Sequence, residues 1–220
     1  MTTLLILGAT GLVGKQLLQQ ALANDSITHI IAPTRRVLPE HLKLENPLVD
    51  FQNLPTQASW WHVDAAVCAL GSTIAQAGSQ EAFYKVDHDF VLAAAQLLHS
   101  AGTPCFVLNS SLGAKIDGGS FYLRVKGQTE RDLTALNFTS LTIVRPSLLD
   151  GGKRPEKRYG EQAAIFFSRL LGPLIPRRLR PVSTALVAGA MLRAALVAPV
   201  GAAIIESDAL HEVHVDLPAG

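Results

Sequence analysis

A strand, a glycine-rich turn and a helix follow one another within the first 23 residues, and this order restricts the fold more than any other feature of the chain. The first glycine of such a turn allows a tight bend, the second removes a side chain where a phosphate approaches, and the third lets the helix pack closely on the sheet. Free amides at the helix N-terminus attract anions. The alternative is a strand-to-helix turn that binds no nucleotide. We predict that the phosphates of a dinucleotide are bound by Gly8, Thr10, Gly11, Leu12, Val13 and Gly14.

Apolar runs of strand length alternate with longer helical segments along the rest of the chain, which is typical of parallel strands joined by crossover helices. Most of the strand-length runs are continuously apolar, as expected for strands covered on both faces. The pattern predicts an α/β fold with a doubly wound, Rossmann-like parallel sheet of about seven strands. Strands are expected at 3–8, 29–33, 48–51, 65–70, 105–109, 141–145 and 202–206, and helices at 12–23, 81–100, 121–136, 162–171 and 184–197.

The chain is expected to form a single NAD(P)-binding domain over residues 1–220. A polar, glycine-bearing and basic stretch begins at residue 150, directly after the sixth predicted strand, and proline-containing breaks follow it. The region is too short and too broken for a second full domain. We interpret residues 150–182 as a small cap over the substrate side of the sheet.

Composition excludes several classes of protein. With 48% hydrophobic residues, 17% charged residues and a net charge of +1, the chain is not disordered and has no overall attraction for nucleic acid. The two cysteines lie in apolar runs, which favours buried thiols in a reducing compartment. The N-terminus lacks the features of a secretory signal, and Arg193 and Pro199 interrupt the apolar stretch 185–205. We therefore expect a cytoplasmic monomer or homodimer that binds a small-molecule substrate and no membrane or metal.

The residues after the second strand bear on the choice of cofactor. An NAD-binding site usually has an acidic residue there, which holds the ribose hydroxyls, whereas this chain has Arg35 and Arg36. Guanidinium groups suit a 2′-phosphate, so NADP(H) is favoured over NAD(H) unless the two arginines are ordinary solvated charges. Asp50, predicted to end the third strand, could accept a bond from the adenine amino group or serve a plain turn. Leu70 and Gly71, at the end of the fourth strand, complete the expected cofactor site.

Tyr122 and Lys126 lie four residues apart on a predicted helix and therefore share one face. A phenol is a poor acid or base at neutral pH, but a nearby ammonium group favours its phenolate form. A serine at the preceding strand end, Ser110 or Ser111, can polarise a substrate carbonyl. An isolated copy of this spacing would indicate only a surface tyrosine packed on a lysine stem. In this chain the tyrosine and lysine follow a complete dinucleotide-binding half of the predicted sheet, which favours a catalytic role for the pair.

Taken together, these motifs resemble the atypical short-chain dehydrogenase/reductases, in particular the NAD(P)-binding proteins related to the human HIV Tat-interacting protein. The resemblance spans residues 3 to about 150 and includes the glycine turn, Val86-Asp87, Ser110-Ser111, Tyr122-x-x-x-Lys126 and Arg145-Pro146-Ser147.

The resemblance implies a role for each residue of a Ser-Tyr-Lys triad. Tyr122 would be the general acid/base, Lys126 would anchor the nicotinamide ribose, and Ser111 would orient the carbonyl, with Ser110 as the alternative. Asp87 departs from the family, since many members have an asparagine there. The implied function is an NADP(H)-dependent oxidoreductase acting on a small carbonyl or alcohol. An NADPH-binding regulatory protein with little turnover is the alternative, and a sugar-nucleotide epimerase is disfavoured because little chain follows the sixth strand.

Overall fold

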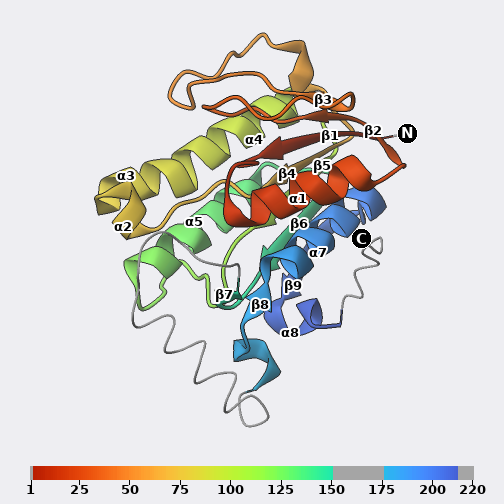
Figure 1. The fold of residues 1–220 in the computed structure, drawn as a ribbon. Helices are drawn as coiled ribbons and strands as arrows, with labels where there is room; N and C mark the ends of the chain where they lie inside the picture. Colours follow the sequence, from red (N-terminus) through yellow and green to blue (C-terminus); the bar gives the residue numbers. More distant parts are fainter. Residues whose placement is uncertain (1, 151–175, 213–220) are drawn as a thin grey trace.

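The computed structural model describes residues 2–150 and 176–212. Its centre is a sheet of seven strands, all parallel, in the order β3-β2-β1-β4-β5-β6-β9 (Figure 1). This confirms the predicted doubly wound fold. The strands are β1 Thr2–Leu7, β2 Ile27–Ile31, β3 Leu44–Glu45, β4 Ala65–Cys68, β5 Cys105–Asn109, β6 Ser140–Arg145 and β9 Gly201–Glu206.

The strand order reverses between β1 and β4, because the chain builds outward from β1 to β3 and then returns to build outward from β4. In open parallel sheets, ligands bind at such a reversal, outside the carboxyl ends of the strands. The fold therefore places the cofactor crevice where β1 and β4 end.

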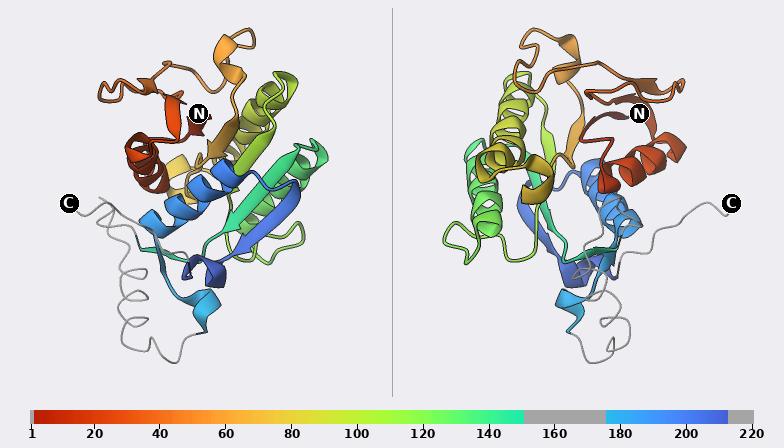
Figure 2. Two further views of the ribbon diagram at one scale, coloured as in Figure 1. Left: turned by 90° about the vertical axis from the view of Figure 1, so that its right-hand side faces the viewer. Right: turned by 60° about the vertical axis from the view of Figure 1, so that its left-hand side comes forward.

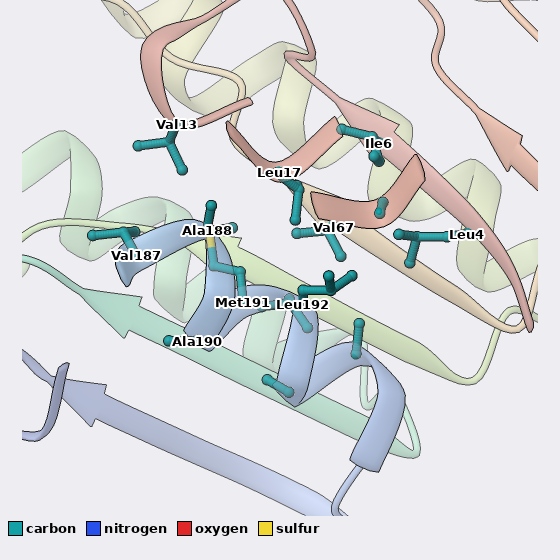
Figure 3. Close-up of a cluster of buried hydrophobic side chains, with 14 of the residues drawn as sticks. Leu4, Ile6, Val13, Leu17, Val67, Val187, Ala188, Ala190, Met191 and Leu192 are labelled. Carbon is teal, nitrogen blue, oxygen red and sulfur yellow. The ribbon is translucent and has the colours of Figure 1, made fainter. Parts of the chain in front are cut away.

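Helices cover both faces of the sheet, as Figure 2 shows. The helices α1 Leu12–Ala23 and α7 Thr184–Val197 lie on one face. The other face is covered by α4 Phe90–Ser100 and α5 Phe121–Ala135. Buried side chains form two clusters, one on each side of the sheet. Figure 3 shows the first cluster, in which Leu17 of α1 and Met191 of α7 pack against Leu4, Ile6 and Val67.

The predicted third strand was wrong. The third strand is the short pair Leu44–Glu45, and Leu48 makes only one isolated bridge, to Thr34. Pro47 has no amide hydrogen to donate to β2, so the ladder is interrupted there, and pairing resumes only at the Thr34–Leu48 bridge. Beyond it the chain turns, and Phe51 packs on Phe90 of α4 with ring centroids 6.0 Å apart.

The predicted helix 81–100 is interrupted. It consists of α3 Gln80–Tyr84, a π-helical turn at Lys85–Asp89 (η2) and α4. Isolated π turns in helices occur frequently at functional sites. Here the turn buries Asp87 and His88.

Several short elements complete the described fold. A small parallel sheet, which we did not predict, joins β7 Leu149–Asp150 to β8 Val182–Ser183 at the two ends of the predicted cap. The predicted helix 162–171 and most of the cap lie outside the described residues. The remaining short helices are η1 Ser59–Trp61, α2 Ile74–Ala77, η4 Arg177–Leu179 and α8 Ser207–Leu210.

Candidate functional site

The glycine turn lies at the carboxyl end of β1, beside the end of β4. Gly8 has a φ of +81°, and a Cβ there would lie 2.6 Å from the carbonyl carbon of Ala69. A Cβ on Gly14 would lie 2.0 Å from the Gly8 carbonyl oxygen, so the helix could not pack this closely with any side chain at that position. The turn is therefore built for close backbone approach, as the sequence predicts.

The N-terminus of α1 is open to a ligand. Gly11 is the N-cap residue and offers no side chain to the first amides of the helix, which also lack acceptors within it. Thr10 and Gly11 are exposed, Leu12 is half-buried, and Val13 is buried. Uncapped amides at a glycine-rich turn fit the pyrophosphate of a dinucleotide.

The arginine loop, residues 32–38, leaves the end of β2. Arg35 and Arg36 are exposed and form no salt bridge within residues 2–150 and 176–212. The Asn46 side-chain amide donates to the Ala32 carbonyl at 2.6 Å and to the Thr34 hydroxyl at 2.8 Å. Thr34 in turn donates to the Arg36 carbonyl at 2.5 Å. The loop backbone is thus fixed while both guanidinium groups remain available.

Asp50 does not end a strand, in contrast to our prediction. Its carboxylate accepts hydrogen bonds from the Gln52 amide at 2.9 Å and the Asn53 side chain at 3.1 Å. These bonds lower the pKa of the exposed Asp50 carboxyl, the Gln52 amide having the larger effect. The residue serves a turn, which is the alternative noted from the sequence, and a contact with adenine stays a prediction.

The two halves of the predicted site meet at Gly71, three residues after β4 ends at Cys68. Leu70 is half-buried and Gly71 is exposed. A Cβ on Gly71 would lie 3.0 Å from Asp87 Oδ1 and 3.5 Å from Lys126 Nζ. The lysine ammonium therefore lies beside the β1–β4 crevice.

Tyr122 and Lys126 lie on the first two turns of α5, which begins after the Ser120 N-cap. Tyr122 is half-buried and packs on Phe83 with ring centroids 5.5 Å apart. Lys126 is buried, and its Nζ lies 2.8 Å from Asp87 Oδ1. Burial opposes the charged lysine, but the negative charge of Asp87 and an interaction with Tyr122 leave the Lys126 pKa above its ordinary value.

The adjacent serines have different surroundings. Ser110 is buried and donates to Glu130 Oε1 at 2.5 Å. The Glu130 carboxylate is also held by the Arg145 guanidinium, at 2.5 and 3.0 Å, and Arg145 pairs with Glu206 at 3.1 Å. The Ser111 hydroxyl is half-buried and has no hydrogen-bond partner among the described residues. Ser111 therefore has the hydroxyl that remains free for a substrate.

Sequence reasoning missed the structural roles of Glu130, Arg145 and Asn46. Glu130 follows Lys126 by one helical turn, so a second charge on the inward face of α5 was the signal for a buried partner. Arg145 ends an apolar strand and was noticed only as part of a motif. Asn46 had no comparable signal, because its partners belong to another strand and loop.

The parallel sheet, the glycine turn at the strand-order reversal and the Tyr-x-x-x-Lys helix beside it define a Rossmann fold of the short-chain dehydrogenase/reductase-like type. Solved structures support the fold. MoeE5 in complex with UDP-glucose and NAD matches with a TM-score of 0.70 and 18% identity, over 94% of this chain and 79% of that chain. The oxidoreductase ylbE from Lactococcus lactis matches with a TM-score of 0.67 and 20% identity, over 96% of each chain.

Curated relatives define the family more narrowly. Protein fmp52, mitochondrial, from Emericella nidulans is 35% identical over 181 residues, which cover 78% of this chain and 77% of that protein. Protein HTATIP2 from Rattus norvegicus is 35% identical over 167 residues, which cover 74% and 68%. No family model matches the chain. The chain belongs to the family of FMP52 and HTATIP2 proteins, which confirms the resemblance found in the sequence.

These relatives contradict the expected cytoplasmic location. The FMP52 proteins from Emericella nidulans, Eremothecium gossypii and Kluyveromyces lactis are all named mitochondrial. The expectation rested on two buried thiols and on the lack of a secretory signal. Buried thiols are compatible with any reducing compartment, so they could not distinguish the cytoplasm from another one.

Two features are absent from the described part of the chain. No helix in it is long and apolar enough to cross a membrane. Nor does it contain three or more His, Cys, Asp or Glu side chains gathered so that they could hold a metal ion.

Proposed function

We propose that this protein is an NADP(H)-dependent oxidoreductase that acts on a small carbonyl or alcohol substrate. The observation that carries the proposal is the juxtaposition at Gly71, where the Lys126 ammonium lies beside the crevice that begins at the glycine turn. A nucleotide held by the turn would extend from α1 toward α5. Its reactive end would then lie among side chains suited to proton transfer.

The residues present fit a dinucleotide. A Cβ on Gly8 or Gly14 would clash with the backbone of the turn, so the turn can be this tight only with glycine, and the first amides of α1 have no side-chain cap to compete with a phosphate. Lys126 would bind the nicotinamide ribose. Arg35 and Arg36, exposed and without ion-pair partners among the described residues, support a 2′-phosphate and hence NADP(H).

Three side chains would have separate roles in the reaction of the substrate. When bound, the nicotinamide supplies or accepts the hydride. The Tyr122 hydroxyl would give its proton to the carbonyl oxygen during reduction, or take one from the alcohol during oxidation. The Ser111 hydroxyl would donate a hydrogen bond to the same oxygen and orient it. The Lys126 ammonium favours negative charge on the tyrosine oxygen left after proton transfer.

Kinetics of matched variants test these roles. In assays of carbonyl reduction by NADPH, Tyr122→Phe should lower kcat by about 10²- to 10⁴-fold while the Kd for NADPH stays nearly unchanged. Ser111→Ala should also lower kcat. Ser110→Ala, the matched control, should reduce stability by about 1 kcal/mol and leave kcat close to the original, because its hydroxyl is already bound to Glu130.

Two outcomes would count against this assignment. If Ser110→Ala lowers kcat and Ser111→Ala does not, the roles of the serines are reversed. If the protein binds NADPH but reduces none of a broad panel of aldehydes and ketones, the oxidoreductase proposal fails. A regulatory role for the bound cofactor would then be the better account.

A further inference from the structure

A buried ion pair lies directly beneath the proposed nicotinamide site. The Asp87 side chain is completely buried and the Lys126 side chain is 7% exposed, with 2.8 Å between Asp87 Oδ1 and Lys126 Nζ. Oδ1 has no other donor among the described residues, and a Cβ on Gly71 would lie 3.0 Å from it, closer than an ordinary contact. The carboxylate therefore has no access to a ligand and acts on the site only through the lysine.

The Asp87 carboxylate is held from its other side. Oδ2 accepts hydrogen bonds from the Ser72 amide at 2.7 Å and from the Ser72 hydroxyl at 2.9 Å. The Asp87 carbonyl accepts one from the Thr129 hydroxyl of α5 at 3.0 Å. The π-helical turn thus holds Asp87 between Ser72, which follows β4, and Thr129 of α5. Because the carboxylate is fixed, it attracts the Lys126 ammonium in one direction.

Three titratable groups act on Lys126 from the described elements around it. They are Asp87 of the π turn, Tyr122 of α5 and Cys68 of β4. Burial raises the pKa of the Cys68 thiol to about 12, so this group is neutral at physiological pH. Of the three, Asp87 has the largest effect in raising the Lys126 pKa. Asp87 is consequently the anion that balances the buried ammonium.

Stability alone gives little reason for such a pair, because burying two charges costs about as much as their attraction returns. We propose that Asp87 is a positioning residue that keeps Lys126 protonated and aims it at the cofactor ribose and Tyr122. The inference rests on the proposed function of Lys126. Many short-chain dehydrogenase/reductases have an asparagine at this position. Because an asparagine carries no charge, it could not balance the lysine ammonium as Asp87 does.

The first test measures the charge of Lys126 directly, in protein without cofactor. NMR titration of ¹³C-labelled lysines, with the Lys126 signal assigned from Lys126→Arg, follows its protonation. In the unsubstituted protein, Lys126 should stay protonated beyond the ordinary lysine value of 10.5. In Asp87→Asn the ammonium loses its counter-charge while remaining buried, so its midpoint should fall by about two pH units or more.

Thr129→Val is the matched control. It removes the hydrogen bond to the Asp87 carbonyl but no charge, so it disturbs the same contact between the π turn and α5. Its Lys126 midpoint should stay close to that of the unsubstituted protein. A midpoint that falls equally in both variants would overturn the inference, because loosened packing would then explain the effect. The inference would also be overturned if Lys126 titrated below its ordinary value in the unsubstituted protein. This outcome can be measured even if Asp87→Asn does not fold.

The second test follows the cofactor. The Kd for NADPH should be nearly constant between about pH 7 and pH 9.5 in the unsubstituted protein. In Asp87→Asn it should rise by about tenfold over that range as Lys126 loses its proton. A flat profile in Asp87→Asn would contradict the positioning role. If the lysine midpoint falls but the unsubstituted protein binds no NADPH, the ion-pair account stands and the proposed function fails.

Discussion

The proposed preference for NADP(H) depends on two individual residues, the arginines Arg35 and Arg36 that follow β2. Neither forms a salt bridge with the described residues, and Asn46 fixes the backbone beneath them. Charge-assisted hydrogen bonds to a 2′-phosphate contribute about 1.5 to 3 kcal/mol each. Arg35→Ala and Arg36→Ala should therefore each raise the Kd for NADPH by about tenfold or more, measured by calorimetry.

NADH is the internal control for this prediction, because it lacks the 2′-phosphate. Its Kd should change little in either variant. If both variants weaken NADH and NADPH equally, the arginines support the loop or the adenosine in general and do not select the cofactor. If neither nucleotide is affected, they are ordinary solvated charges.

The two cysteines provide a prediction on pH and reactivity. Burial raises the pKa of the Cys68 thiol to about 12 and also raises that of Cys105. Since the thiolate is the reactive form, neither should react with a thiol reagent in the folded protein at about pH 8, and both should react in urea. The unfolded chain releases these protons at lower pH than the folded chain. Stability should therefore fall as the pH rises from about 9 toward 12.

The measurement is a reaction with an aromatic disulfide with and without denaturant, and unfolding in urea at several alkaline pH values. Rapid modification of a thiol in the folded protein would show that β4 or β5 opens easily. That result would contradict the burial of these strands under helices on both faces.

At the scale of elements, the Glu130–Arg145 pair joins α5 to the end of β6, next to the serines. Glu130→Gln keeps the shape of the side chain but removes the charge that faces Arg145 from within the protein. Because Glu206 remains as a second partner of Arg145, we expect a loss of about 3 kcal/mol in the free energy of unfolding, at the low end for a broken buried pair. Urea unfolding measures it.

The control is Asp117→Asn, which removes the carboxylate of a pair with Lys115 in which both side chains are 71% exposed. Exposed pairs contribute little, so this variant should unfold at nearly the same urea concentration as the unsubstituted protein. Equal effects of the two substitutions would mean that the buried network does not hold α5 against the sheet.

At the scale of the whole molecule, the sequence predicted what depends on local pattern. The apolar runs of β1, β4, β5 and β6, and the glycines at the end of β1, were sufficient to predict the fold and the tight glycine turn. The third strand could not be predicted in the same way. Its two residues pair with β2, and the next residue, Asn46, supports this pairing by donating a hydrogen bond to the Ala32 carbonyl after β2. Such long-range contacts leave no periodicity in the sequence.

The candidate site, too, could be predicted only in part from the sequence. The spacing of Tyr122 and Lys126 gave their shared helix face, and the serines were placed correctly at a strand end. The ion pair beneath them was not predictable, because it requires a π turn inside a segment with an uninterrupted helical pattern. Asp87 was noticed as a departure from the family, but its partner became evident only from the structure.

The central claim is that the β1–β4 crevice binds a nicotinamide dinucleotide, and calorimetric titration of the full chain with NADPH and NADH tests it most directly. The control is Gly11→Ala, because Gly11 has a φ of −76°, which alanine also adopts, and a Cβ there would lie 3.3 Å from the Gly8 carbonyl oxygen, inside the turn that we expect to bind the phosphates. We predict saturable binding of one nucleotide per chain, tighter for NADPH, and a large loss of affinity in a folded Gly11→Ala. Binding of neither nucleotide, or unchanged binding in Gly11→Ala, would contradict the claim.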